Sequence, residues 1–110
     1  MSSKNVETYK LAKGLEISRA VTGLWQIADM EKDGNTLDPV NTAKFMAPYA
    51  ASGLFTFDMA DHYGSAEIIA GTFKKNQSEG PKARLLTKWV PKPGPVTRDQ
   101  VREAVQARLD

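Results

Sequence analysis

Strand-like and helix-like segments alternate regularly along this 110-residue chain. Extended apolar runs lie near residues 20, 55 and 85, and a helical pattern follows each of them. Strands that alternate with helices in this way favour βαβ units, in which the strands are parallel and the helices cover the sheet. The sequence therefore predicts an α/β fold.

A β-hairpin is expected over residues 7–18, before the first of these units. Two short runs of alternating apolar and polar residues lie on either side of Gly14, at residues 9–11 and 15–17. This pattern is typical of two half-buried strands joined by a tight turn. A third extended run, residues 20–25, follows directly.

The first helix is predicted to begin at Asp38, as N-cap, with Pro39 at the first helical position. Gly53 would end it. Pro48 lies inside this stretch and removes a helical hydrogen bond, so we expect a kink or an early end there. The preceding polar stretch contains a turn signal at residues 33–34.

Two further helices follow. Ser65 is expected to cap the second, which would run to about Asn76, and Thr97 and Gln100 form a capping-box pair for the third. The remaining segments are predicted as strands at 54–58 and 84–90, and as loops at 77–82 and 91–96.

Composition narrows the classes of function. The chain has no cysteine, which excludes disulfide scaffolds, thiol catalysis and cysteine-ligated zinc. A net charge of +2, spread along the chain, is too small to indicate nucleic-acid binding. No apolar run is long enough for a membrane span, the first ten residues do not form a secretory signal, and no metal site is indicated. We therefore expect a cytoplasmic protein.

Three parallel strands with open edges make an incomplete sheet, since such sheets are normally buried on both faces. The last predicted helix also reaches Asp110 without a C-cap signal. A (β/α)₈ TIM barrel takes about 250 residues. Residues 1–110 are thus expected to be the N-terminal part of one barrel domain, and the open edge predicts self-association.

Two charged residues are predicted to meet at the carboxyl ends of neighbouring strands. Side chains alternate along a strand, so Asp58 faces away from Phe55 and Phe57, and Lys88 faces away from Trp89. If the aromatic residues face the helices, Asp58 and Lys88 face inward, at the rim where barrel enzymes place catalytic groups.

Tyr63 follows on the next loop and completes a possible proton donor. A lysine cation favours the phenolate and so makes a phenol a better acid. A purely structural ion pair between Asp58 and Lys88, with Tyr63 as plain packing, is the competing interpretation.

Residues 57–67, FDMADHYGSAE, resemble the signature of the aldo-keto reductase family. Residues 14–18 and 22–25 resemble the family's N-terminal hairpin and first barrel strand, and residues 86–88 resemble the strand that delivers its lysine. The resemblance covers residues 9–110. It implies a (β/α)₈ barrel and an NADPH-dependent oxidoreductase that reduces small-molecule carbonyl compounds.

The resemblance also implies roles for single residues. Tyr63 would be the general acid, Lys88 would assist it, and Asp58 would hold Lys88 and contact the cofactor ribose. The cofactor-binding residues would be Gly23, Leu24, Trp25 and Asp58, and the substrate pocket would contain Trp25, His62, Tyr63 and Trp89. For Trp89, which faces outward by the alternation above, packing in the core against a helix competes with this role. The family's catalytic histidine would fall beyond Asp110, and His62 does not take its place.

A second function stays open beside catalysis. Some relatives act as non-catalytic, cofactor-sensing or partner-binding proteins, and the sequence alone does not separate that role from reduction of aldehydes and ketones. The isolated 110 residues are expected to be inactive, because most of the cofactor site would be missing.

Overall fold

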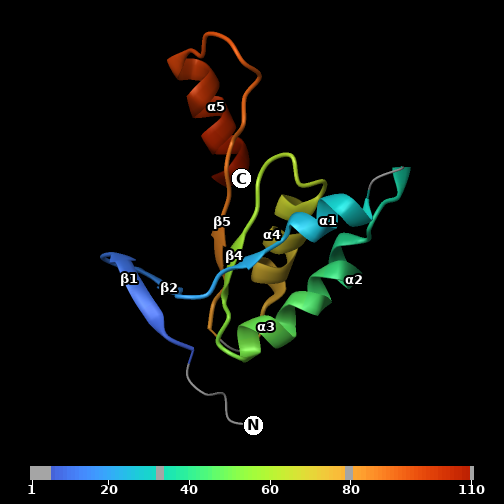
Figure 1. The fold of residues 1–110 in the computed structure, drawn as a ribbon, viewed down its shortest axis with the longest axis vertical. Helices are drawn as coiled ribbons and strands as arrows, with labels where there is room; N and C mark the ends of the chain where they lie inside the picture. Colours follow the sequence, from blue (N-terminus) through green and yellow to red (C-terminus); the bar gives the residue numbers. More distant parts are fainter. Residues whose placement is uncertain (1–5, 32–33, 79–80, 110) are drawn as a thin grey trace.

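The computed structural model describes residues 6–31, 34–78 and 81–109 (Figure 1). The elements are, in order, β1 (Thr8–Ala12), β2 (Leu15–Ser18), β3 (Thr22–Gly23), α1 (Trp25–Met30), α2 (Pro39–Ala43), the 3₁₀ helix η2 (Lys44–Met46), α3 (Ala47–Ala51), β4 (Thr56–Asp58), α4 (Ala66–Asn76), β5 (Arg84–Leu86) and α5 (Arg98–Leu109). The predicted mixed α/β fold is confirmed.

The central sheet has the order β3-β4-β5, and both neighbouring pairs are parallel, as the spacing predicts. Phe57 in β4 lies opposite Thr22 on one side and Leu85 on the other. Backbone pairing continues past the strand ends, because Met59 N donates to Leu86 O at 2.9 Å and Asp61 N donates to Lys88 O at 2.9 Å. The segment after β4 therefore stays beside the segment after β5.

The hairpin is also confirmed. β1 and β2 pair antiparallel, and Gly14 takes a φ of 78° at their turn, a conformation that glycine adopts without a Cβ penalty. The hairpin is attached to the sheet where β4 begins, since Ser18 N donates to Thr56 Oγ1 at 2.9 Å in a buried contact. It thus lies away from the carboxyl ends of the strands.

The helix that begins at Asp38 is interrupted as predicted. Asp38 accepts a hydrogen bond from Asn41 N at 3.3 Å and caps α2. The chain then passes through η2, and Pro48 lies in the first turn of α3, where a missing N–H costs little. Gly53 follows with a φ of 102°, in the left-handed region expected after a helix end.

The prediction of an extended run over residues 20–25 is wrong at its end. The strand β3 stops at Gly23, and Trp25 begins α1, which packs beside α4. Residues 25–30 contain neither glycine nor proline, so no residue there forbids a helix, and the helix that forms contacts α4. Of the predicted turn, Gly34 has a φ of 83°, whereas Asp33 lies outside the described residues.

The hydrophobic core lies between the sheet and the helices α2, α3 and α4. Phe57 is fully buried, and its ring meets Phe73 of α4 edge-on, with centroids 6.2 Å apart. Other members of the core cluster come from the strand ends, from η2 and from the same helices: Leu24, Ala43, Met46, Ala50, Phe55, Met59, Ala66, Ile69, Ala70 and Ala83.

The helix α5 projects away from this core (Figure 1). Its capping box is formed as predicted, with Thr97 N donating to Gln100 Oε1 at 2.8 Å and Gln100 N donating to Thr97 Oγ1 at 3.1 Å. None of its residues is buried, and Val101, Val105 and Leu109 are exposed. Within the described ranges, no helix is long and apolar enough to cross a membrane.

Candidate active site

Asp58 and Lys88 form the predicted ion pair at the carboxyl ends of β4 and β5. Lys88 Nζ lies 3.0 Å from Asp58 Oδ1 and 3.1 Å from Oδ2, and it also donates to Met59 O at 2.8 Å. The two side chains are 40% and 49% exposed, so the pair is open to solvent on one side. The contact holds the lysine in place and leaves the carboxylate accessible.

Side-chain alternation explains this placement. Phe57 faces the helices and is fully buried, so its neighbour Asp58 faces the opposite side of the sheet. The bond from Asp61 N to Lys88 O keeps the segment after β5 in line with the segment after β4. Together they bring two residues 30 positions apart into contact.

Tyr63 lies next to this pair, on the loop before α4. Lys88 Nζ is 5.6 Å from the centroid of its ring, a cation–π arrangement, and the ring packs against the core. Tyr63 N donates to Ala60 O at 3.1 Å, which tightens the loop. Within the described ranges, the Tyr63 hydroxyl has no hydrogen-bond partner.

His62 is the exposed neighbour of Tyr63. The two rings meet edge-on with centroids 5.1 Å apart, and His62 Nδ1 lies 3.1 Å from Asp61 Oδ1. The Asp61 carboxylate therefore orients the imidazole beside the phenol. His62 is at the exposed side of the cluster, and its place in a substrate pocket stays a prediction.

Asp61 anchors the loop on its other side. Asp61 Oδ2 accepts a hydrogen bond from Val90 N at 2.9 Å and lies 3.9 Å from Arg108 Nη2 of α5. The Val90 backbone N–H and then the His62 hydrogen bond lower the pKa of the Asp61 carboxyl below its ordinary value. The ionised carboxylate thus ties the loop to the segment after β5.

The lowered pKa of Asp61 predicts a pH-dependent contribution to stability. The folded state holds the proton less tightly than the unfolded state, so the contribution is complete above the ordinary aspartate pKa of about 3.9 and is lost as pH falls through the folded value. We expect the difference in free energy of unfolding between the wild type and Asp61→Asn to narrow below about pH 4. Denaturant unfolding at several pH values measures it, and a constant difference would contradict the assignment.

Sequence reasoning missed the charge network that joins α5 to this loop. Glu67 Oε2 lies 3.2 Å from Arg108 Nε and accepts a hydrogen bond from Thr87 Oγ1 at 2.5 Å. Arg108 therefore contacts both Glu67 and Asp61. These partners are 41 and 47 positions apart in the sequence, and no local pattern indicates such a pairing.

The predicted cofactor-binding residues Gly23, Leu24 and Trp25 differ in their exposure to solvent. Trp25 is 58% exposed, and a Cβ added to Gly23 would meet no heavy atom within 4 Å, so both border open space. Leu24 is buried in the core, and its N–H donates to Asp58 O at 2.9 Å. Its side chain therefore does not face the site.

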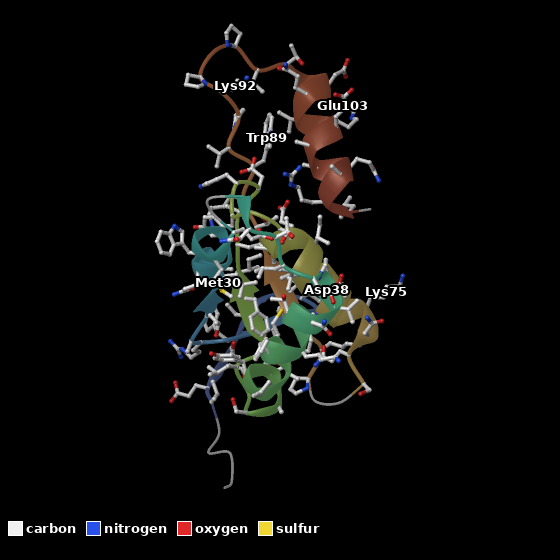
Figure 2. The ribbon with its side chains drawn as sticks, turned by 90° about the vertical axis from the view of Figure 1, so that its right-hand side faces the viewer. Met30, Asp38, Lys75, Trp89, Lys92 and Glu103 are labelled. Atoms are coloured by element: carbon white, nitrogen blue, oxygen red, sulfur yellow. The ribbon has the colours of Figure 1, made fainter. Side chains whose placement is uncertain are left out.

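Trp89 directly follows Lys88 on the segment after β5. It is half-buried, and Figure 2 shows its side chain on the segment between β5 and α5, on the side toward the helix. Trp89 is not among the members of the core cluster, so the expected packing in the core is not observed. A separate groove of about 340 Å³, between α2, α3 and α4, contains none of the predicted site residues.

Comparison with known proteins gives one match. The sequence model of the Aldo/keto reductase family matches residues 20–110, which is most of the chain and includes Asp58, Tyr63 and Lys88. Neither the curated proteins nor the solved structures contain a significant match.

Proposed function

We propose a carbonyl reductase function for this chain, which belongs to the aldo/keto reductase family, a family of oxidoreductases that generally use NAD(P)H. In this proposal the chain provides the catalytic rim of an enzyme that reduces aldehydes or ketones to alcohols with NADPH. The observation that carries it is the Asp58–Lys88 ion pair beside the Tyr63 ring, at the carboxyl ends of two parallel strands.

Tyr63 is the proton donor in this proposal. Bound NADPH would supply the hydride that reduces the carbonyl carbon. The Tyr63 hydroxyl then gives its proton to the carbonyl oxygen as negative charge develops there. Lys88 stabilises the phenolate that forms, and Asp58 keeps the ammonium group beside the ring.

The residues around the rim are chemically suited to a dinucleotide. Each Asp58 oxygen contacts Lys88 and keeps a further lone pair, which suits a hydrogen bond from a ribose hydroxyl. Gly23 has open space where a side chain would be, so the backbone is accessible to a flat ring. The exposed Trp25 ring supplies an apolar wall that helps exclude water from the reacting carbonyl.

The fold supports a place for the chain in a (β/α)₈ barrel, as the hairpin and the first three βα units. The parallel strands have the order that successive barrel strands take, and the exposed apolar residues of α5 suit burial against further units. Pairing of the β5 edge with a second copy is the competing arrangement. Size measurement at several concentrations separates the two, since self-association through that edge depends on concentration.

The proposed function is tested in the full-length gene product, which in this proposal carries further βα units after residue 110. We expect oxidation of NADPH that depends on a simple aldehyde, followed by the loss of NADPH absorbance. Residues 1–110 expressed alone are expected to give no turnover, because the three units form only part of a closed barrel pocket. Absence of turnover in the gene product, or turnover by residues 1–110 alone, would contradict the corresponding part of the proposal.

A further inference from the structure

The Glu31 carboxylate forms hydrogen bonds with two segments that are distant in sequence. Glu31 Oε1 accepts from Ser65 N at 2.7 Å, and Oε2 accepts from Ser65 Oγ at 2.7 Å and from Leu37 N at 3.2 Å. Ser65 lies 34 positions away, at the start of α4. One side chain therefore joins the end of α1 to the loop that carries Tyr63.

This contact replaces the cap predicted for α4. Ser65 occupies the N-cap position but makes no side-chain hydrogen bond to its own helix, and its hydroxyl donates to Glu31. The Glu31 carboxylate thus occupies the helix N-terminus, where the helix dipole favours negative charge. The hydrogen bonds from the Ser65 hydroxyl and backbone lower the pKa of Glu31, so the carboxylate is ionised near neutral pH.

The two ends of the contact are close to two residues of the proposed site. Glu31 directly follows α1, whose first residue is Trp25, and Ser65 is two residues after Tyr63. A helix is rigid along its length, so the position of Glu31 is fixed relative to Trp25. On the other side, only Gly64, with a φ of 55°, lies between Tyr63 and Ser65. Fixing Ser65 to the end of α1 therefore limits how far Tyr63 moves relative to Trp25.

We infer that Glu31 is a positioning residue, which holds the Tyr63 loop in place relative to α1 and Trp25 in the proposed carbonyl site. This inference rests on the proposed function, because it assigns Tyr63 the role of proton donor. Other contacts hold the first half of the loop. Asp58 forms an ion pair with Lys88, and Asp61 accepts a hydrogen bond from Val90 N. Glu31 holds the second half.

The kinetic test compares Glu31→Ala with Glu31→Gln in the gene product. A displacement of the order of 1 Å costs about 100-fold in rate, so we expect Glu31→Ala to lower kcat by roughly 10- to 100-fold. The Kd for NADPH should stay within about twofold, since Glu31 is not among the residues proposed to contact it. Glu31→Gln keeps an acceptor for Ser65 N, so its kcat should fall less than that of Glu31→Ala. Glu103→Ala, on the exposed surface of α5, is the matched control and should leave kcat unchanged.

Double substitution separates positioning from a general structural role. If Glu31 acts through Tyr63, the Glu31→Ala substitution should lower kcat only slightly further in a Tyr63→Phe background, because the two effects are not additive. An equal loss of kcat in both backgrounds would overturn the inference. Absence of turnover in the wild type would instead contradict the proposed function.

Amide hydrogen exchange tests the contact itself without any turnover. In Glu31→Ala, we expect exchange at Ser65 and Leu37 to become at least about tenfold faster, because both amides lose a charged acceptor. Exchange at Ile69 and Phe73, inside α4, should change little. Unchanged protection at Ser65 would overturn the inference even if kcat falls.

Discussion

Substitution of Tyr63 by phenylalanine in the gene product is expected to lower kcat by about 10²- to 10⁴-fold, the usual contribution of a positioned general acid. The change removes one oxygen atom and leaves the ring that packs against the core and faces Lys88. The fold and the Kd for NADPH should therefore persist. Steady-state reduction of an aldehyde, together with a fluorescence titration of NADPH, measures both quantities.

Tyr49→Phe is the matched control, because Tyr49 is an exposed residue of α3, outside the proposed site. We expect no change in kcat for this variant. If Tyr63→Phe also keeps kcat within about twofold, the hydroxyl is not the proton donor. That result would favour the alternative of a non-catalytic, cofactor-sensing protein.

Phe57→Ala is expected to cost about 3 to 5 kcal/mol of the free energy of unfolding. Phe57 is fully buried in the central strand and contacts Phe73 of α4, so its removal leaves a cavity between sheet and helices. The free energy of unfolding of a whole domain is about 5 to 15 kcal/mol, so the variant loses a large part of its stability. Because Asp58 is the next residue, the site should be disturbed as well.

Phe45→Ala is the matched control for the core. Phe45 lies in η2 and is 75% exposed, so its truncation should change the free energy of unfolding by no more than about 0.5 kcal/mol. Denaturant unfolding of both variants measures the difference. Equal losses would show that Phe57 does not occupy the core as described.

Much of the fold could be predicted because its causes are local in the sequence. The capping residues Asp38 and Thr97, the interruption at Pro48 and the hairpin turn at Gly14 each act on neighbouring backbone groups. The pattern and the structure agree at these positions. Alternation predicts the side of the sheet on which Asp58 lies. Lys88 meets it from the segment after β5, because that strand ends at Leu86 and does not continue to residue 90 as predicted.

The remaining features depend on partners that are far away in sequence. Residues 25–30 form a helix that contacts α4, and Leu24, directly before this helix, is buried in the core. Ser65 lies at the start of α4 as expected, but its hydroxyl donates to Glu31, 34 positions earlier, and makes no hydrogen bond to its own helix. Arg108 reaches Asp61 and Glu67 in the same manner. Propensity and spacing do not contain such information.

Transfer of deuterium from labelled NADPH tests the central claim most directly. The gene product is mixed with an aldehyde and NADPH that carries deuterium at both C4 positions, and the alcohol is analysed by mass spectrometry. If the rim of Asp58, Tyr63 and Lys88 belongs to a carbonyl reductase, the alcohol gains one deuterium at the former carbonyl carbon, and Tyr63→Phe slows its appearance. An alcohol without deuterium, or no alcohol at all, would contradict the account.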